Sequence, residues 1–189
     1  LIFISLCFLF VINGANLIDG YNGLLGLHSL IIIVNLFLIN YVNGNSDLSL
    51  LLFLAMLALI SFLIFNFPKA KIFLGDGGAY FLGTFIAVAT IKTSIMNPAI
   101  SPFYFCILLF YLFFEVFFSF FRKLYQKKSP VLPDKEHLHM LSYLKFSRIF
   151  GTDKGNYINS IIINFVFSLL VLPSLYFADN SLICKYWFF

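Results

Sequence analysis

The chain has 189 residues, of which 61% are hydrophobic and 11% are charged, and its formal net charge is +4. Soluble domains are about 45–50% apolar, so this composition excludes an ordinary soluble fold and indicates a polytopic membrane protein. The three cysteines are few and two of them lie inside apolar runs, which excludes a disulfide framework.

Six apolar stretches predict membrane spans, because a helix needs about 20 apolar residues to cross a bilayer. The first stretch is short and ends before polar Asn13, so we interpret it as the remainder of a span in a longer protein. We expect an all-α integral membrane protein with one transmembrane domain, residues 1–189, that lacks upstream spans. The predicted spans are 1–12, 24–42, 48–66, 79–96, 103–121 and 158–177.

The polar segments between the spans are sorted by charge. Because each span crosses the bilayer once, segments 13–23, 67–78 and 122–157 fall on the same side. That side carries ten of the twelve lysines and arginines, which by the positive-inside rule makes it cytoplasmic. We therefore expect an active site at the cytoplasmic face, built from three loops. The acids and histidines sorted to that side are Asp19, Asp76, Asp134, His137 and His139.

The second of these loops contains KIFLGDGG, residues 71–78, which places Asp76 between glycines at the mouth of a span. An acid there is costly unless it is solvated, paired or bound to metal. Glycines allow close backbone approach, and the start of the next helix favours anions, so a divalent cation and a phosphate would both fit. Taken alone, the loop is equally consistent with Asp76 as a helix cap.

The other two loops are ambiguous in isolation. In NLIDGYNGL, residues 16–24, Asp19 and Asn22 either face one pocket or are simple turn and cap residues. The segment RKLYQKKSPVLPDKEHLHML, residues 122–141, combines cations with two histidines, and such side chains donate to phosphoryl oxygens. A basic loop that touches anionic lipid headgroups is the alternative.

Together, NLIDGYNGL, KIFLGDGG and SPVLPDKEHLH resemble the polyprenyl-phosphate N-acetylhexosamine-1-phosphate transferases, glycosyltransferase family 4. The resemblance implies transfer of a sugar 1-phosphate from a UDP-N-acetylated sugar to undecaprenyl phosphate, with release of UMP. This reaction initiates lipid-linked cell-surface glycans in the bacterial cytoplasmic membrane, with Mg²⁺ as cofactor. Relatives can be homodimers, and nothing in the pattern indicates nucleic acid as a partner.

The resemblance also implies roles for single residues. Asp76 matches a magnesium-binding aspartate, Phe73 an aromatic residue near the uracil, and His137 and His139 match histidines that contact substrate phosphates. The catalytic candidates are therefore Asp76, His137 and His139. The further substrate-binding candidates are Asn16, Asp19, Asn22 and Asn66, and Glu115 and Arg122 match an acid and a base found just before the third loop.

The chain departs from the family pattern in four places. Asn22 stands where many members have an aspartate, Met140 replaces a histidine, Ala79 replaces a serine, and no Asp-Asp pair occurs anywhere. The missing pair leaves a non-catalytic remnant of the family as one alternative. A transporter or channel segment is the other, although the nearly clean span centres disfavour it.

Four polar residues inside the predicted spans are expected to have structural roles. His28 should be buried and hydrogen-bonded, and Asn35 and Asn40 should bond between helices. Glu115 lies within the phenylalanine-rich FYLFFEVFFSFF and needs a partner, because an isolated charge in lipid is costly.

Overall fold

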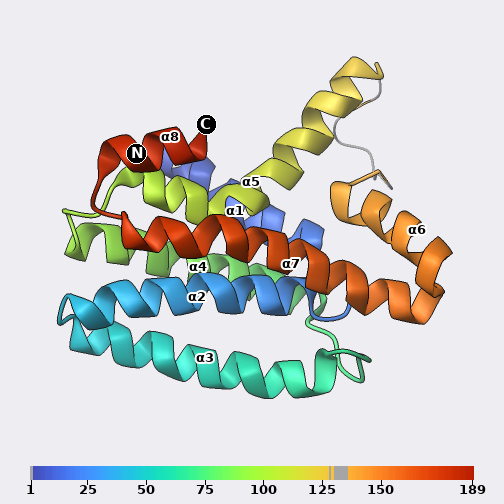
Figure 1. The fold of residues 1–189 in the computed structure, drawn as a ribbon, viewed down its shortest axis with the longest axis horizontal. Coiled ribbons are helices and arrows are strands. Elements are labelled where there is room, and N and C mark those ends of the chain that lie inside the picture. Colours follow the sequence, from blue (N-terminus) through green and yellow to red (C-terminus); the bar gives the residue numbers. More distant parts are fainter. Residues whose placement is uncertain (1, 128, 130–135) are drawn as a thin grey trace.

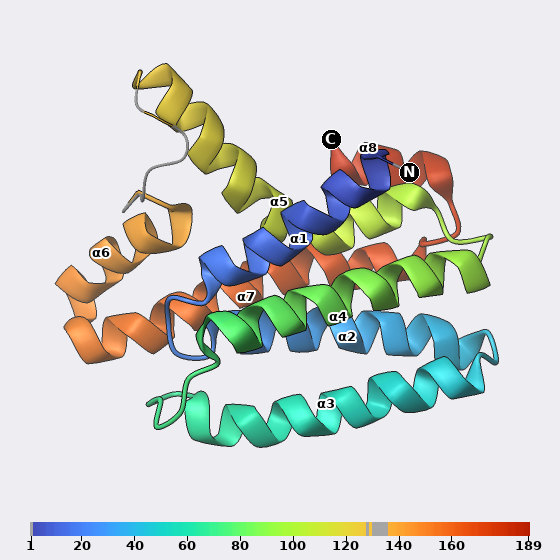
Figure 2. The same ribbon diagram turned by 180° about the vertical axis from the view of Figure 1, so that it is seen from behind.

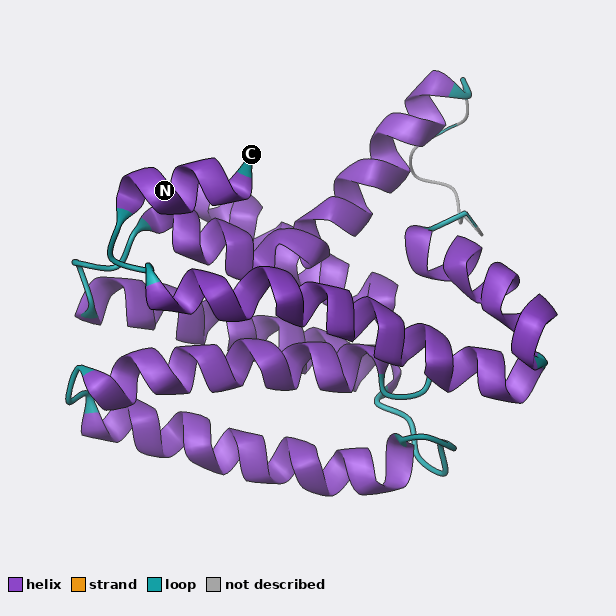
Figure 3. Ribbon diagram, viewed as in Figure 1, coloured by secondary structure: helices purple, strands orange, loops and turns teal. Residues whose placement is uncertain are grey.

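The computed structural model describes residues 2–127, 129 and 136–189, so the predicted site-side residue Asp134 lies outside the described residues. All secondary structure in the described part of the chain is helical (Figure 3). The helices are α1 (Ile2–Ile18), α2 (Leu24–Val42), α3 (Ser46–Asn66), α4 (Gly75–Met96), α5 (Pro102–Tyr125), α6 (Leu138–Phe150), α7 (Thr152–Tyr176) and α8 (Ser181–Phe188).

Five of these helices are long and apolar enough to cross a membrane, namely α2, α3, α4, α5 and α7, and α1 is a shorter apolar helix. The long helices lie side by side in a bundle, and the C-terminal half of α5 tilts away from it (Figures 1 and 2). The predicted class, an all-α polytopic membrane protein, is confirmed.

The prediction of a loop at residues 13–23 is wrong for its first half, because α1 continues through the polar residues to Ile18. The small residues of this part of α1 pack against neighbouring helices. A Cβ on Gly14 would collide with the backbone carbonyl of Leu112 in α5, and one on Gly83 of α4 would lie 2.8 Å from the Cβ of Ala15. Small residues let membrane helices approach closely, so Gly14 and Ala15 serve contact with α5 and α4 rather than a turn.

The long predicted loop 122–157 is also wrong over much of its length. Helix α5 extends to Tyr125, α6 occupies Leu138–Phe150, and α7 begins at Thr152. The turn between α6 and α7 is made by Gly151, whose φ of 81° is in the left-handed region that favours glycine. Helix α6 lies directly against the start of α7, since a Cβ on Gly155 would be 2.7 Å from the Cα of Ser147.

The two ends of the bundle have different characters. The loops after α1 and α3 and helix α6 gather at one end (Figure 1). The opposite end is closed by a buried amide cluster, in which Asn40 donates to Thr93 Oγ1 at 2.8 Å and accepts from Asn45 and Asn97 at 3.1 Å. The bond between Asn40 and Thr93 joins α2 to α4, as predicted for Asn40, and the bond from Tyr104 to Asn35 joins α5 to α2 at 3.2 Å.

Candidate active site

Two asparagines hold the first and second loops together. Asn66, the last residue of α3, accepts from the backbone N–H of Gly23 and donates to the carbonyl of Ile72, each at 2.8 Å. Asn22 donates from its side chain to the carbonyl of Pro68 at 3.0 Å. Both residues were predicted to bind substrate, and this stays a prediction. In this structure their side-chain amides connect the first loop to the second by hydrogen bonds.

Asp19 and Asp76 come from these two loops and influence each other. Asp76 is exposed in the first turn of α4, and Asp19 is half-buried just after α1. Burial of the carboxyl group, together with the nearby negative charge of Asp76, raises the pKa of Asp19 to about 6. A cation bound between the two carboxylates would relieve the repulsion that Asp76 exerts on Asp19.

The first turn of α4 leaves room beside Asp76. Gly75 has a φ of 62°, and a Cβ placed on Gly75 or Gly77 would meet nothing within 4 Å. Packing within the described chain therefore gives no reason for glycine at position 77. The helix start has no side-chain cap, so its backbone N–H groups are available to an anion. Phe73 precedes this turn with 74% of its surface exposed.

The donor set suits magnesium better than a metal bound entirely by protein. The described residues contain no group of three or more His, Cys, Asp or Glu side chains placed to hold a metal ion. Magnesium is commonly held by one or two carboxylates and completes its shell with water and substrate phosphates. Asp76 and Asp19 beside an open helix start fit that pattern.

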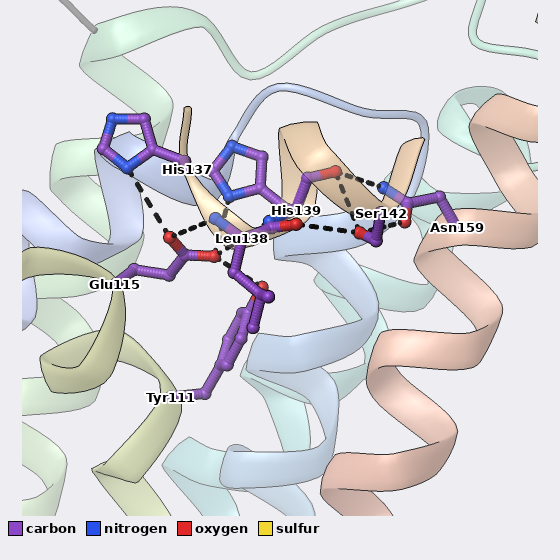
Figure 4. A network of polar contacts seen from close by, with 7 residues as sticks. All are labelled: Tyr111, Glu115, His137, Leu138, His139, Ser142 and Asn159. Carbon is purple, nitrogen blue, oxygen red and sulfur yellow. Dashed lines mark hydrogen bonds and ion pairs between the residues drawn. The ribbon is translucent and has the colours of Figure 1, made fainter. Parts of the chain in front are cut away.

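The third loop is anchored by Glu115, a fully buried residue of α5 (Figure 4). Its carboxylate accepts from the hydroxyl of Tyr111 at 2.8 Å and from the backbone N–H groups of Leu138 and His139 at 3.3 and 3.2 Å. It also contacts Nδ1 of His139 at 2.9 Å and Nδ1 of His137 at 3.5 Å. The partner that the sequence requires for Glu115 is thus the start of α6.

Both histidines are buried, and His139 lies next to the first loop. The rings of His137 and His139 stack at 5.5 Å with an interplanar angle of 12°. His139 meets the ring of Tyr21 edge-on at 5.7 Å, and its Nε2 lies 3.8 Å from the position of a Cβ on Gly20. The three loops predicted to form one site are therefore in contact at one end of the bundle.

A row of asparagines on α7, which the sequence analysis missed, holds this arrangement. Asn156 accepts from the backbone N–H of Asn22 at 2.8 Å, and Asn159 donates to the carbonyl of His139 at 2.9 Å. Asn164 donates to the carbonyl of Leu24 at 3.2 Å. Polar residues spaced by three and five positions on an apolar helix were the available signal, since such residues usually face the protein interior.

Three remaining candidates have defined positions. Asn16 lies in α1 and donates to the hydroxyl of Tyr80 in α4 at 3.1 Å. Arg122 pairs with Glu136 at 3.5 Å. His28 is buried, lies 3.3 Å from the amide oxygen of Asn164 through Nδ1, and packs on the ring of Phe167, which confirms its structural interpretation.

Fold and site together define a multi-pass helical membrane protein with carboxylates and imidazoles gathered at one end of its bundle. Residues 1–94 match the family model described as glycosyl transferase family 4. The chain is 31% identical over 150 residues to the undecaprenyl-phosphate alpha-N-acetylglucosaminyl 1-phosphate transferase of Thermotoga maritima, an alignment that covers 79% of this chain and 44% of that protein.

A second relative is the phospho-N-acetylmuramoyl-pentapeptide-transferase of Dictyoglomus turgidum, which is 46% identical over 88 residues, 47% of this chain and 28% of the relative. The chain thus spans less than half the length of these curated relatives. It belongs to glycosyl transferase family 4, as its three loop motifs predict.

Proposed function

We propose that the full-length protein containing this chain transfers an N-acetylhexosamine 1-phosphate from a UDP-sugar to undecaprenyl phosphate and releases UMP. The observation that supports this most is the meeting of three separate loops, which brings Asp19, Asp76, His137 and His139 to one end of an apolar bundle. The names of the relatives support the same reaction class.

The proposed chemistry follows from the reactants. A lipid phosphate acceptor requires a site at the membrane surface, and an anionic soluble donor is attracted by a basic face. Phosphoryl transfer depends mainly on positioning and on neutralising charge over the phosphoryl oxygens. Asp76 and Asp19 would hold Mg²⁺, which supplies that neutralisation when bound. The open first turn of α4 would admit the diphosphate, and we place this end of the bundle in the cytoplasm.

The test is an assay of bacterial membranes that carry the full-length protein. A panel of UDP-N-acetylated sugars is presented with undecaprenyl phosphate and Mg²⁺, and both UMP and lipid-linked product are measured. We expect UMP and lipid product in equal amounts with at least one donor. No product with any donor, from protein shown to be inserted, would favour the non-catalytic alternative.

A further inference from the structure

The carboxylate of Glu115 determines how the two histidines face the site. An ionised carboxylate only accepts hydrogen bonds and has about four lone-pair positions. Glu115 accepts from the Tyr111 hydroxyl and from two backbone N–H groups, and it lies 2.9 Å from Nδ1 of His139. Because an ionised carboxylate only accepts, an ionised Glu115 requires that Nδ1 of His139 carry the hydrogen of that bond.

The hydrogen on Nδ1 also determines the role of Nε2, at the opposite edge of the imidazole. In a neutral ring with hydrogen on Nδ1, Nε2 is a bare acceptor. The Nε2 atom of His139 is buried and has no hydrogen-bond partner among the described residues. A buried polar atom left without a partner is destabilising, so the fold maintains this orientation against a penalty. A Cβ added at Gly20 of the first loop would lie 3.8 Å from Nε2.

Glu115 also fills the anion-binding position at the start of α6. The backbone N–H groups of Leu138 and His139 belong to the first turn of α6 and both donate to this carboxylate. A substrate phosphate is therefore excluded from that helix start. Phosphate recognition by the third loop is left to the imidazole edges that face away from Glu115, as Figure 4 shows for both rings.

From these contacts we propose that Glu115 is a positioning residue for the transfer reaction: it locks His139 with Nδ1 inward, so that the acceptor Nε2 faces the space beneath the first loop and accepts a hydrogen bond from a protonated oxygen of a substrate phosphate. This inference rests on the proposed function for the identity of the phosphate. Glu115 itself, enclosed by Tyr111 and α6, does not touch substrate. Carboxylate–histidine pairs of this kind fix the tautomer and the ring orientation in other sites.

The first test reads the tautomer directly. Full-length protein labelled with ¹⁵N-histidine in nanodiscs is examined by NMR, and the signals of His139 are assigned by their loss in His139→Asn. We expect hydrogen on Nδ1 and a bare Nε2 in the wild type. In Glu115→Gln the amide N–H can donate to Nδ1, which should shift the hydrogen to Nε2. A wild-type ring with hydrogen on Nε2, or a tautomer unchanged in Glu115→Gln, overturns the proposal.

The second test uses kinetics and a ligand. Glu115→Gln should lower kcat by about 10- to 100-fold, the range seen at metal sites when the hydrogen-bond partner of a ligating histidine is removed. The matched control Tyr111→Phe removes another donor to the same carboxylate and should leave both kcat and the His139 tautomer close to wild type. Equal losses in the two variants would indicate a packing role for Glu115 and overturn the proposal.

A ligand experiment separates this inference from the proposed function. Addition of UMP to the wild type should change the Nε2 signal of His139. The change should be much smaller in Gly20→Val, because the valine side chain would cover Nε2. Normal transfer activity without any response of Nε2 to UMP overturns the inference alone. Absence of transfer with every donor, together with the predicted tautomer, counts against the proposed function instead.

Discussion

At the residue scale, Asp76 is exposed and close enough to a second carboxylate, that of Asp19, to influence it, which is the arrangement expected of a metal-binding acid. We predict that Asp76→Asn lowers UMP release on the order of 100-fold or more, because the neutral amide binds Mg²⁺ weakly. Stability should barely change. The mutation loses a favourable charge at the start of α4, worth about 0.3–1 kcal/mol, but relieves repulsion with Asp19.

The measurement pairs a UMP-release assay across magnesium concentrations with thermal unfolding of the purified full-length protein. Exposed Asp153, in the first turn of α7, offers the control Asp153→Asn, which removes a charge from a comparable helix start. That control should keep wild-type turnover. Full turnover in Asp76→Asn at ordinary magnesium concentrations would remove the metal role from this residue.

Also at the residue scale, the sequence identified candidate side chains but not the contacts that they make. The family motifs identified Glu115 and His139 separately, and the need for a partner of Glu115 was evident from its apolar surroundings. Their bond could not be predicted, because residues 122–157 were expected to be a loop without a helix. An i to i+24 contact depends on where α6 begins, and no local pattern fixes that point.

At the element scale, the placement of α6 depends on close contact with α7. We predict that Gly155→Val displaces α6, because its side chain would have to enter the space now filled by the backbone of Ser147. Overpacking of this kind costs about 1–3 kcal/mol. The displacement should pull His139 from Glu115 and lower transfer activity, while α3 and α4, which lie farther from this contact, remain folded (Figure 1).

Circular dichroism of the purified full-length protein measures whether the helices remain folded, and a transfer assay measures the loss of activity. Thr152→Val, an exposed and nearly isosteric change in the same turn of α7, is the control and should behave like wild type. Unchanged activity in Gly155→Val would mean that α6 can shift without consequence for the site.

The same scale explains where the sequence interpretation failed. Long apolar runs predict spanning helices because lipid forces backbone hydrogen bonds to be internal. Polar and small residues within α1 were interpreted as a loop, because their suitability for helix contact depends on Leu112 of α5 and Gly83 of α4, which only the fold brings near. Helices α6 and α8 are short and flank turn-rich segments, so their pattern resembled that of loops.

At the scale of the whole molecule, strict alternation of spans was the most informative single inference. It placed three loops together before any contact was known, and the described loops do meet at one end of the bundle (Figure 2). The fold does not determine which membrane face that end occupies. The orientation depends on the bilayer and on the lysines and arginines of the loops.

That question leads to a prediction about labelling from the two sides of the membrane. Single cysteines are introduced at exposed Lys71, Lys154 and Gly44 in full-length protein lacking its own cysteines. Lys71 and Lys154 lie in segments at the site end, whereas Gly44 lies in the turn at the other end. Because the cationic segments should remain in the cytoplasm, an impermeant maleimide should label the first two only in inverted vesicles and Gly44→Cys only in intact spheroplasts. Labelling of Lys71→Cys and Lys154→Cys from opposite sides would separate the second and third loops, and no shared phosphate site could then exist.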